Sequence, residues 1–149
     1  MIKQIRYRGM TLIEVLLVIG LLGALVGLAI PFYQSFQVTS ELDNTTHEII
    51  SALRLAQGRA MASENFESHG VHFETGEFTV FSGDEYDAND PKNFATEISR
   101  TLSINAESAD MIFTKVMGIP ENTFGVVITS SSGEQRLISV NEMGMVNEQ

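Results

Sequence analysis

The sequence predicts an α+β protein in which a long N-terminal helix, apolar in its first half, packs on an antiparallel β-rich head. Two observations predict this plan. Residues 10–31 form an apolar run that is almost uninterrupted. From residue 63 onward the apolar residues change from a helical period to the alternation typical of strands. At 149 residues, the chain is long enough for one modest domain and a terminal segment, but not for two domains.

The chain begins with a basic leader, residues 1–9, which carries Lys3, Arg6 and Arg8 and no acid. The apolar run over residues 10–31 follows it directly and is long enough to enter a bilayer as one membrane-spanning helix. Positive charge before a span favours a cytoplasmic N-terminus. We therefore expect a single-pass protein of the inner membrane whose head lies in the periplasm.

One acid, Glu14, lies just inside the start of the apolar run. An ionised side chain in a membrane helix costs about 2.5 to 3.5 kcal/mol at the centre and less near an end, so Glu14 indicates a partner. Cleavage between Gly9 and Met10 would create an amine four residues before Glu14, on the same helix face. This amine could pair with Glu14 of its own chain or of a neighbouring subunit.

Small residues recur within the apolar run. Gly20 with Ala24, and Gly23 with Gly27, form two pairs that would let helix backbones approach closely. The alternative is that glycine is simply commoner in membrane helices. Pro31 lacks a backbone donor and clashes with the preceding turn, so we expect the helix to kink or loosen there.

Residues 32–62 predict an amphipathic continuation of the same helix, which we expect to run from about residue 10 to residue 62. Its charged residues can lie on one side, and its apolar residues follow helical spacings. Such an apolar stripe needs a cover, so this half should pack on the head. The residues of the apolar stripe are Phe36, Leu42, Ile49, Leu53, Ala56 and Ala60.

Residues 63–149 predict the β-rich head. Residues 69–74 and 78–81 alternate in polarity around Thr75-Gly76-Glu77, which indicates a hairpin. The polar stretch 82–93 predicts an exposed loop. Four further strands are expected over residues 96–104, 110–116, 124–130 and 136–141.

The residues Gly9-Met10-Thr11-Leu12-Ile13-Glu14-Val15, with the apolar run and Pro31, resemble the class III signal of type IV pilins and type II secretion pseudopilins. This resemblance implies cleavage by a prepilin peptidase after Gly9 and N-methylation of Met10. It also implies assembly into a filament through the N-terminal helices, with Glu14 as the partner of the new amine. Met10 departs from the family pattern, which usually has Phe after the cut.

The head resembles the H-type pseudopilins of type II secretion and the FimT-like minor pilins. The residues that carry this resemblance are the helix end over 53–60, the strand pair around Phe73 and Val80, and the segment 138–146. The implied function is that of a minor pseudopilin in a pseudopilus that drives protein export. The implied partners are other pilins, the prepilin peptidase and an inner-membrane assembly platform.

Three alternatives remain open at this point. The first is a minor pilin of a type IV pilus, acting in initiation, adhesion or DNA uptake. The second, from another class, is a secreted soluble binding module released by a conventional signal peptidase, which would remove residues 10–30. The third is an uncleaved single-span anchor, in which Glu14 would have no purpose. The net charge of −10 becomes −13 for the side chains without the leader, and a protein this acidic is a poor match for nucleic acid.

Sites for chemistry are not evident in the sequence, and we expect neither an enzyme nor a cofactor. There is no cysteine, which excludes disulfides and thiolate metal sites. His69 and His72 would point to opposite faces of a strand, which does not suit chelation. The loop over 82–93 offers candidate calcium ligands without EF-hand spacing, and a solvated loop is the alternative. These candidates are Asp84, Glu85, Asp87 and Asp90.

Overall fold

The computed structural model describes residues 9–149, apart from the side chains of residues 28–32 and 34. The predicted basic residues Lys3, Arg6 and Arg8 lie outside this part of the chain. Contacts divide the chain into two compact units, Met1–Phe36 and Gln37–Gln149. We call the described part of the first unit the stem and the second unit the head.

One helix, α1 (Leu12–Met61), forms most of the stem and the first element of the head. The sequence predicts this helix with nearly the same bounds, and that prediction is confirmed. The helix continues through Pro31 without ending there. The expected membrane span is not supported, because no helix among the described residues is long and apolar enough to cross a membrane.

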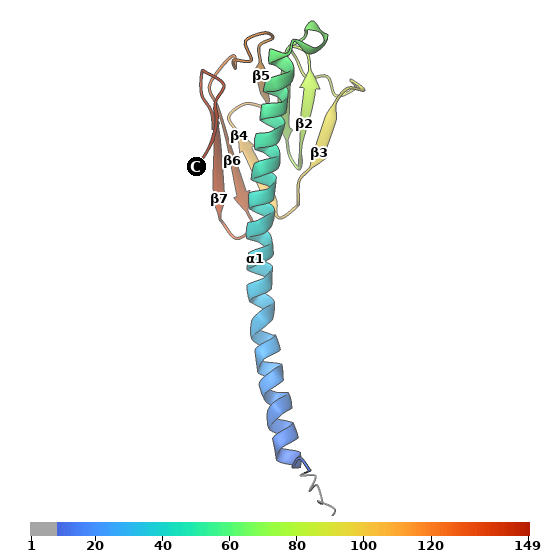
Figure 1. Ribbon diagram of the computed structural model, residues 1–149, viewed down its shortest axis with the longest axis vertical. Helices are drawn as coiled ribbons and strands as arrows, with labels where there is room; N and C mark the ends of the chain where they lie inside the picture. The colour runs from blue at the N-terminus through green and yellow to red at the C-terminus, as the bar shows by residue number, and fades with distance from the viewer. Residues whose placement is uncertain (1–8) are drawn as a thin grey trace, which may run out of the picture. The chain divides into compact units, whose positions relative to one another are not determined.

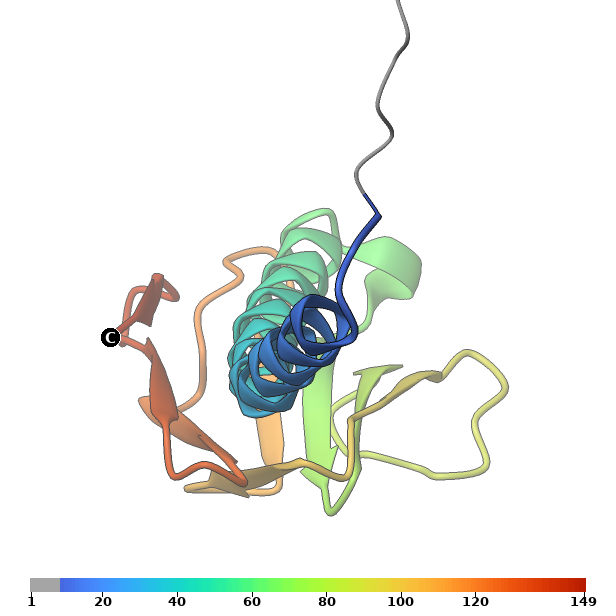
Figure 2. The ribbon, with the colours of Figure 1, turned by 90° about the horizontal axis from the view of Figure 1, so that it is seen from below.

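The head contains two antiparallel sheets of four strands each (Figure 1). In the first sheet the strand order is β3-β2-β1-β5, and in the second it is β4-β6-β7-β8. A short 3-10 helix, η1 (Glu64–Phe66), joins α1 to the first strand. Seen from below, the two sheets form neighbouring walls around the head's part of α1 (Figure 2). The strands are β1 (His69–Glu74), β2 (Glu77–Ser82), β3 (Phe94–Glu97), β4 (Leu102–Ala106), β5 (Asp110–Phe113), β6 (Phe124–Ser130), β7 (Gln135–Val140) and β8 (Val146–Glu148).

The predicted hairpin is confirmed, since β1 and β2 pair from Glu74 with Glu77 outward. Gly76, in the turn, has a φ of 91°, which glycine adopts without steric cost. The single strand expected over 96–104 is wrong. The chain turns at Ser99, whose carbonyl accepts a hydrogen bond from Leu102 N at 3.0 Å. This turn sends β3 to pair with β2 and β4 to pair with β6 in the other sheet.

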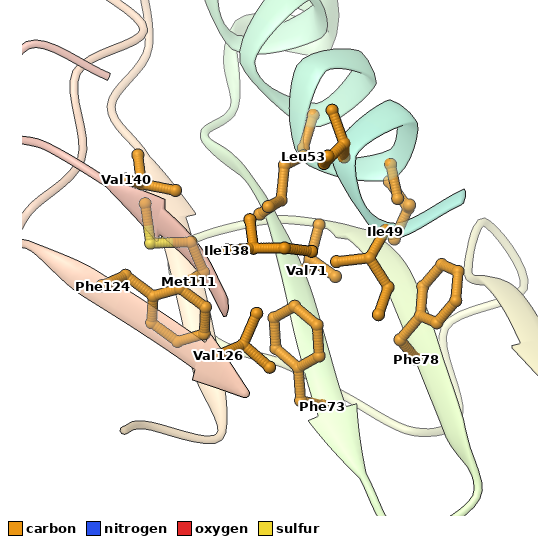
Figure 3. Packing of buried hydrophobic residues seen from close by; sticks show 14 of the residues in the cluster. Ile49, Leu53, Val71, Phe73, Phe78, Met111, Phe124, Val126, Ile138 and Val140 are labelled. Carbon is orange, nitrogen blue, oxygen red and sulfur yellow. The ribbon is translucent and has the colours of Figure 1, made fainter. Parts of the chain in front are cut away.

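The core lies between α1 and the inner faces of both sheets. Five predicted residues of the helix stripe are fully buried: Leu42, Ile49, Leu53, Ala56 and Ala60. In Figure 3, Ile49 and Leu53 point toward Val71 and Ile138 of the two sheets. Phe36 was expected in this stripe, but it is 72% exposed, and the first buried residue in the described part of the helix is Leu42.

Polar contacts fix the lower part of the head's helix to the loops. The Glu41 carboxylate accepts hydrogen bonds from Thr101 Oγ1 at 2.6 Å and Ser99 Oγ at 3.1 Å. These hydrogen bonds, that from Thr101 first, hold the pKa of Glu41 below its ordinary value. The Asp43 carboxylate pairs with the Arg136 guanidinium at 2.9 Å. The helix therefore binds both the β3–β4 connection and strand β7.

Near its upper end, α1 binds two other connections through one side chain. Gln57 Nε2 donates to the carbonyl of Gly118 at 2.9 Å and to that of Gly144 at 3.0 Å. Both glycines are buried and have positive φ values of 61° and 79°. Gln57 thus joins the β5–β6 and β7–β8 connections to the helix.

Candidate assembly surface

The stem helix begins with a reciprocal pair of hydrogen bonds. Glu14 N donates to Thr11 Oγ1 at 3.3 Å, while Thr11 N donates to Glu14 Oε2 at 3.5 Å. This is the geometry of a capping box, in which a threonine before the helix and an acid three residues later satisfy two free backbone donors. Glu14 therefore has a local partner in its own chain.

The sequence contains the signal for this cap, because Thr11-Leu12-Ile13-Glu14 fits the pattern Thr-x-x-Glu before an apolar run. Sequence reasoning missed it, since it treated Glu14 only as a charge in need of a partner. The carboxylate also lies in the first turn of the helix, where the partial positive charge of the N-terminus favours an anion. The structure thus explains why an acid is tolerated beside the apolar run.

Gly9 and Met10, between which cleavage is predicted, precede the helix and are exposed. Helix α1 starts at Leu12, so an amine created at Met10 would lie directly before the first turn. The free backbone donors of that turn repel a cation, whereas the Glu14 carboxylate attracts it. Cleavage would therefore place the new charge next to the one acid of the stem. Cleavage itself stays a prediction.

The apolar side chains of the stem are exposed in every direction around the helix. Consecutive residues project about 100° apart, so a run of exposed apolar residues leaves no polar side. Large exposed apolar surfaces of this kind mark interaction sites. The exposed residues are Met10, Leu12, Ile13, Val15, Leu16, Leu17, Val18, Ile19, Leu21, Leu22, Leu25 and Val26.

The small residues of the stem face open space. Apart from the adjacent residues and the nearby backbone of the helix itself, no described atom lies within 4 Å of the place that a Cβ would take at Gly20, Gly23 or Gly27, and Ala24 is exposed. Close approach of another helix at these positions stays a prediction. The predicted bend at Pro31 also stays a prediction, and its side chain lies outside the described part.

The candidate calcium ligands of the acidic loop are not gathered into one group in the described part of the chain. Among residues 9–149 as described, no group of three or more acidic, histidine or cysteine side chains could hold a metal ion. Two of the candidate ligands instead accept hydrogen bonds from their own loop. Asp87 Oδ1 binds Asn89 N, and Asp90 Oδ1 binds Lys92 N, each at 2.9 Å. These carboxylates shape turns, while Asp84 and Glu85 are exposed.

The histidines of β1 lie in different surroundings, as the strand period predicts. His69 is fully buried, whereas His72 is only partly buried. His72 Nδ1 lies 2.6 Å from Asp110 Oδ1, and its ring stacks on Tyr86 at a centroid distance of 3.9 Å. His72 therefore holds the loop that follows β2 against the first sheet.

Comparison with known proteins bears on the fold. No model of a known protein family matches the chain, and no curated protein matches it. Among solved structures, the chain is similar to the minor pseudopilin EpsH from the type 2 secretion system of Vibrio cholerae, with a TM-score of 0.57 and 18% sequence identity. The match covers 73% of this chain and 96% of the EpsH chain. It confirms the predicted resemblance to the pseudopilins at the level of the fold, with a helix packed on antiparallel sheets.

Proposed function

We propose that this chain is a structural subunit of the pseudopilin type, which joins a type II secretion pseudopilus through its stem. The observation that carries the proposal is the stem helix, which begins at a capped acid and is apolar on every side. A monomer leaves this surface in contact with water, whereas a bundle of such helices buries it. The fold shared with EpsH supports the secretion system over a type IV pilus.

In this proposal a prepilin peptidase cleaves the chain after Gly9, and the amine of Met10 is then methylated. The amine competes with Thr11 N for the same carboxylate, since Glu14 Oε2 is the atom that caps the helix. Within an apolar bundle, a carboxylate and an amine left apart would both be costly to bury. Pairing the amine of one subunit with Glu14 of its neighbour lowers that cost and sets the register of the two helices.

The proposed setting is the cell envelope, and the proposed partners are other pilin-like subunits, the peptidase and the assembly platform. The chain is then the substrate of an enzyme rather than an enzyme. We also propose the role of a minor subunit, which is what the name of EpsH states for that protein.

Three variants separate the charge of Glu14 from its capping role. Glu14→Gln keeps a capping side chain but loses the charge. Thr11→Ala removes the cap and keeps the charge, at a cost of about 1 kcal/mol to the helix. Glu14→Leu removes both. We expect Glu14→Gln and Glu14→Leu to reduce co-assembly with tagged wild-type subunits by roughly a hundredfold, whereas Thr11→Ala should assemble almost normally.

The measurement is recovery of each variant with tagged filament subunits, together with intact mass of the chain from cells with and without the peptidase. A peptidase-dependent mass that begins at methylated Met10 is expected for the wild type and for all three variants. Normal assembly of Glu14→Gln would contradict the charge pairing. Removal of residues 10–30 would contradict the pseudopilin proposal and would favour a secreted binding module.

A further inference from the structure

A groove runs along one side of α1 in the head, over strands β2 and β3, with a volume of about 590 Å³. Its floor is apolar and includes Phe78, Val80 and Phe94. Its rim on the helix is mainly polar, and the residues that line it there are Asn44, His47, Glu48, Ser51, Ala52 and Leu55. In Figure 1 these two strands lie beside the upper part of α1.

The groove exists because the first sheet is wider than the helix that covers it. Phe94 lies opposite Val80 in the pairing of β3 with β2, so both side chains are on the inner face of the sheet. A helix about 10 Å across covers roughly two strands spaced about 4.8 Å apart. Val80 is 2% exposed, but Phe94, one strand further out, is 63% exposed. The inner face of β3 is therefore not covered by α1.

The helix side of the groove is suited to a second helix. Asn44, His47, Ser51 and Leu55 are spaced by three or four residues, so they lie on successive turns of one side of α1. Ridges of this spacing are those along which two helices pack. The eleven residue steps from 44 to 55 correspond to about 16 Å, or roughly three turns of a partner helix.

We propose that this groove seats the stem helix of a second copy of the chain; this inference rests on the proposed function. The stem is apolar on all sides, so contact with one neighbouring stem leaves other sides that also need a cover. The apolar floor of the groove offers such a cover to one apolar side of the stem. The net charge of −10 disfavours an acidic partner helix, while residues 15–27 of the stem carry no charge at all.

Cysteine cross-linking tests the seat directly, because the chain has no cysteine of its own. One full-length copy carries Ser51→Cys in the groove. The other carries Leu17→Cys or Ile19→Cys, which lie on opposite sides of the stem helix. Arg54→Cys is the control, since Arg54 is exposed on the same helix but does not line the groove. After oxidation in co-expressing cells, we expect a disulfide-linked dimer from Ser51→Cys with one of the stem cysteines, and at least roughly tenfold less from Arg54→Cys.

A second substitution tests whether the groove floor is responsible. Phe94→Ser should reduce the Ser51 cross-link roughly tenfold, because it removes an aromatic anchor. Phe66→Ser, at a residue that is exposed outside the groove, should not change it. Equal cross-linking by Ser51→Cys and Arg54→Cys, no effect of Phe94→Ser, or a cross-link from Ser51→Cys to another protein would each overturn the inference.

These outcomes are distinct from failure of the proposed function. If the wild-type chain does not join filament subunits at all, the proposed function is wrong. If it joins them while the groove variants behave like their controls, only the seat in the groove is wrong.

Discussion

Two parts of one helix, α1, differ in how they bury apolar residues. In the stem, residues 12–26 are apolar apart from Glu14, and they are exposed all around the helix. In the head, the apolar residues lie on one side, and Leu42, Ile49 and Leu53 are fully buried. Polar residues on the same part of the helix also bind the rest of the head, as Asp43 does in pairing with Arg136 of β7. The comparison teaches that the period of the apolar residues, rather than their number, decides whether a helix is covered by its own chain or by partners.

This difference separates stability from assembly. The head closes its core within one chain, so substitutions there should change the free energy of unfolding. The stem leaves its surface to other molecules, so substitutions there should change association and leave the head as stable as before.

The largest expected effect is that of Leu53→Ala. Leu53 is fully buried between the helix and the sheets, and removing it should lower the free energy of unfolding of the head by about 2 to 5 kcal/mol. Urea unfolding of the purified chain, followed by circular dichroism, measures this loss. Leu55→Ala is the matched control on the same helix, because Leu55 is 44% exposed. Similar losses for the two variants would mean that the helix is not buried on the side described.

A smaller effect is expected for Gln57→Ala. The change removes the donor that joins the carbonyls of Gly118 and Gly144, and leaves two buried acceptors without it. The free energy of unfolding should fall by about 1 to 3 kcal/mol. Hydrogen exchange should also become faster in the β5–β6 and β7–β8 connections. Unchanged exchange in either connection would show that Gln57 does not hold that connection.

The stem counterpart, Leu17→Ala, should have almost no effect on unfolding of the head. Leu17 is exposed in the stem, so the change in the free energy of unfolding should stay within about 0.5 kcal/mol. Recovery with tagged filament subunits should fall instead, because the variant buries less apolar surface on assembly. A loss of head stability as large as that of Leu53→Ala would contradict the view that stem residues affect assembly and not the stability of the head.

The subtlest effect is on pH dependence. The pKa of Glu41 is lowered from an ordinary value of 4.5 by hydrogen bonds from Thr101 and Ser99. The contribution of Glu41 to the stability of the folded state is therefore present above pH 4.5, and it is lost as the pH falls through the lower pKa of the folded state. Glu41→Gln should reduce the fall of the melting temperature on acidification below pH 4.5. An unchanged slope would contradict the role of these hydrogen bonds.

The pKa of Glu77 is shifted in the opposite direction to that of Glu41. A proton shared with Glu74, with smaller contributions from burial and from the charges of Glu74 and Glu97, raises the pKa of Glu77 above 4.5. The contribution of Glu77 to the stability of the folded state is complete below pH 4.5, and it is lost as the pH rises through the raised pKa. Glu77→Gln should therefore raise the melting temperature more above this range than below it. The reverse order would show that Glu74 and Glu77 do not share a proton.

Much of the fold follows from local patterns in the sequence. The helix stripe from Leu42 to Ala60 and the hairpin around Gly76 depend on neighbours within a few residues, so their spacing predicts them. The break between β3 and β4 does not, because Ser99-Arg100-Thr101 contains neither glycine nor proline. That turn is stabilised by Glu41, which lies 58 residues before Ser99 in the chain. β8 was missed for a similar reason, since its three residues form a strand only by pairing with β7.

For the candidate site, the sequence predicts the apolar stem and the position of its acid, but not the local hydrogen bonds of that acid. The pattern Thr-x-x-Glu was available and was overlooked. The groove beside α1 could not be predicted, because it depends on Phe94 lying one strand beyond the edge of the helix. The spacing of residues in the sequence does not predict how wide a sheet is relative to the helix that covers it.

The contacts of Gln57 also have a consequence for the order of folding. The partner carbonyl of Gly144 lies 87 residues after Gln57 in the chain. During synthesis the helix is complete long before this carbonyl emerges, whereas the β1–β2 hairpin can form with residues close by. The head therefore acquires this contact with the helix only after all of its strands but β8 have been synthesised. Until the second sheet is also synthesised, only the first sheet can shield the apolar side of the helix from premature association.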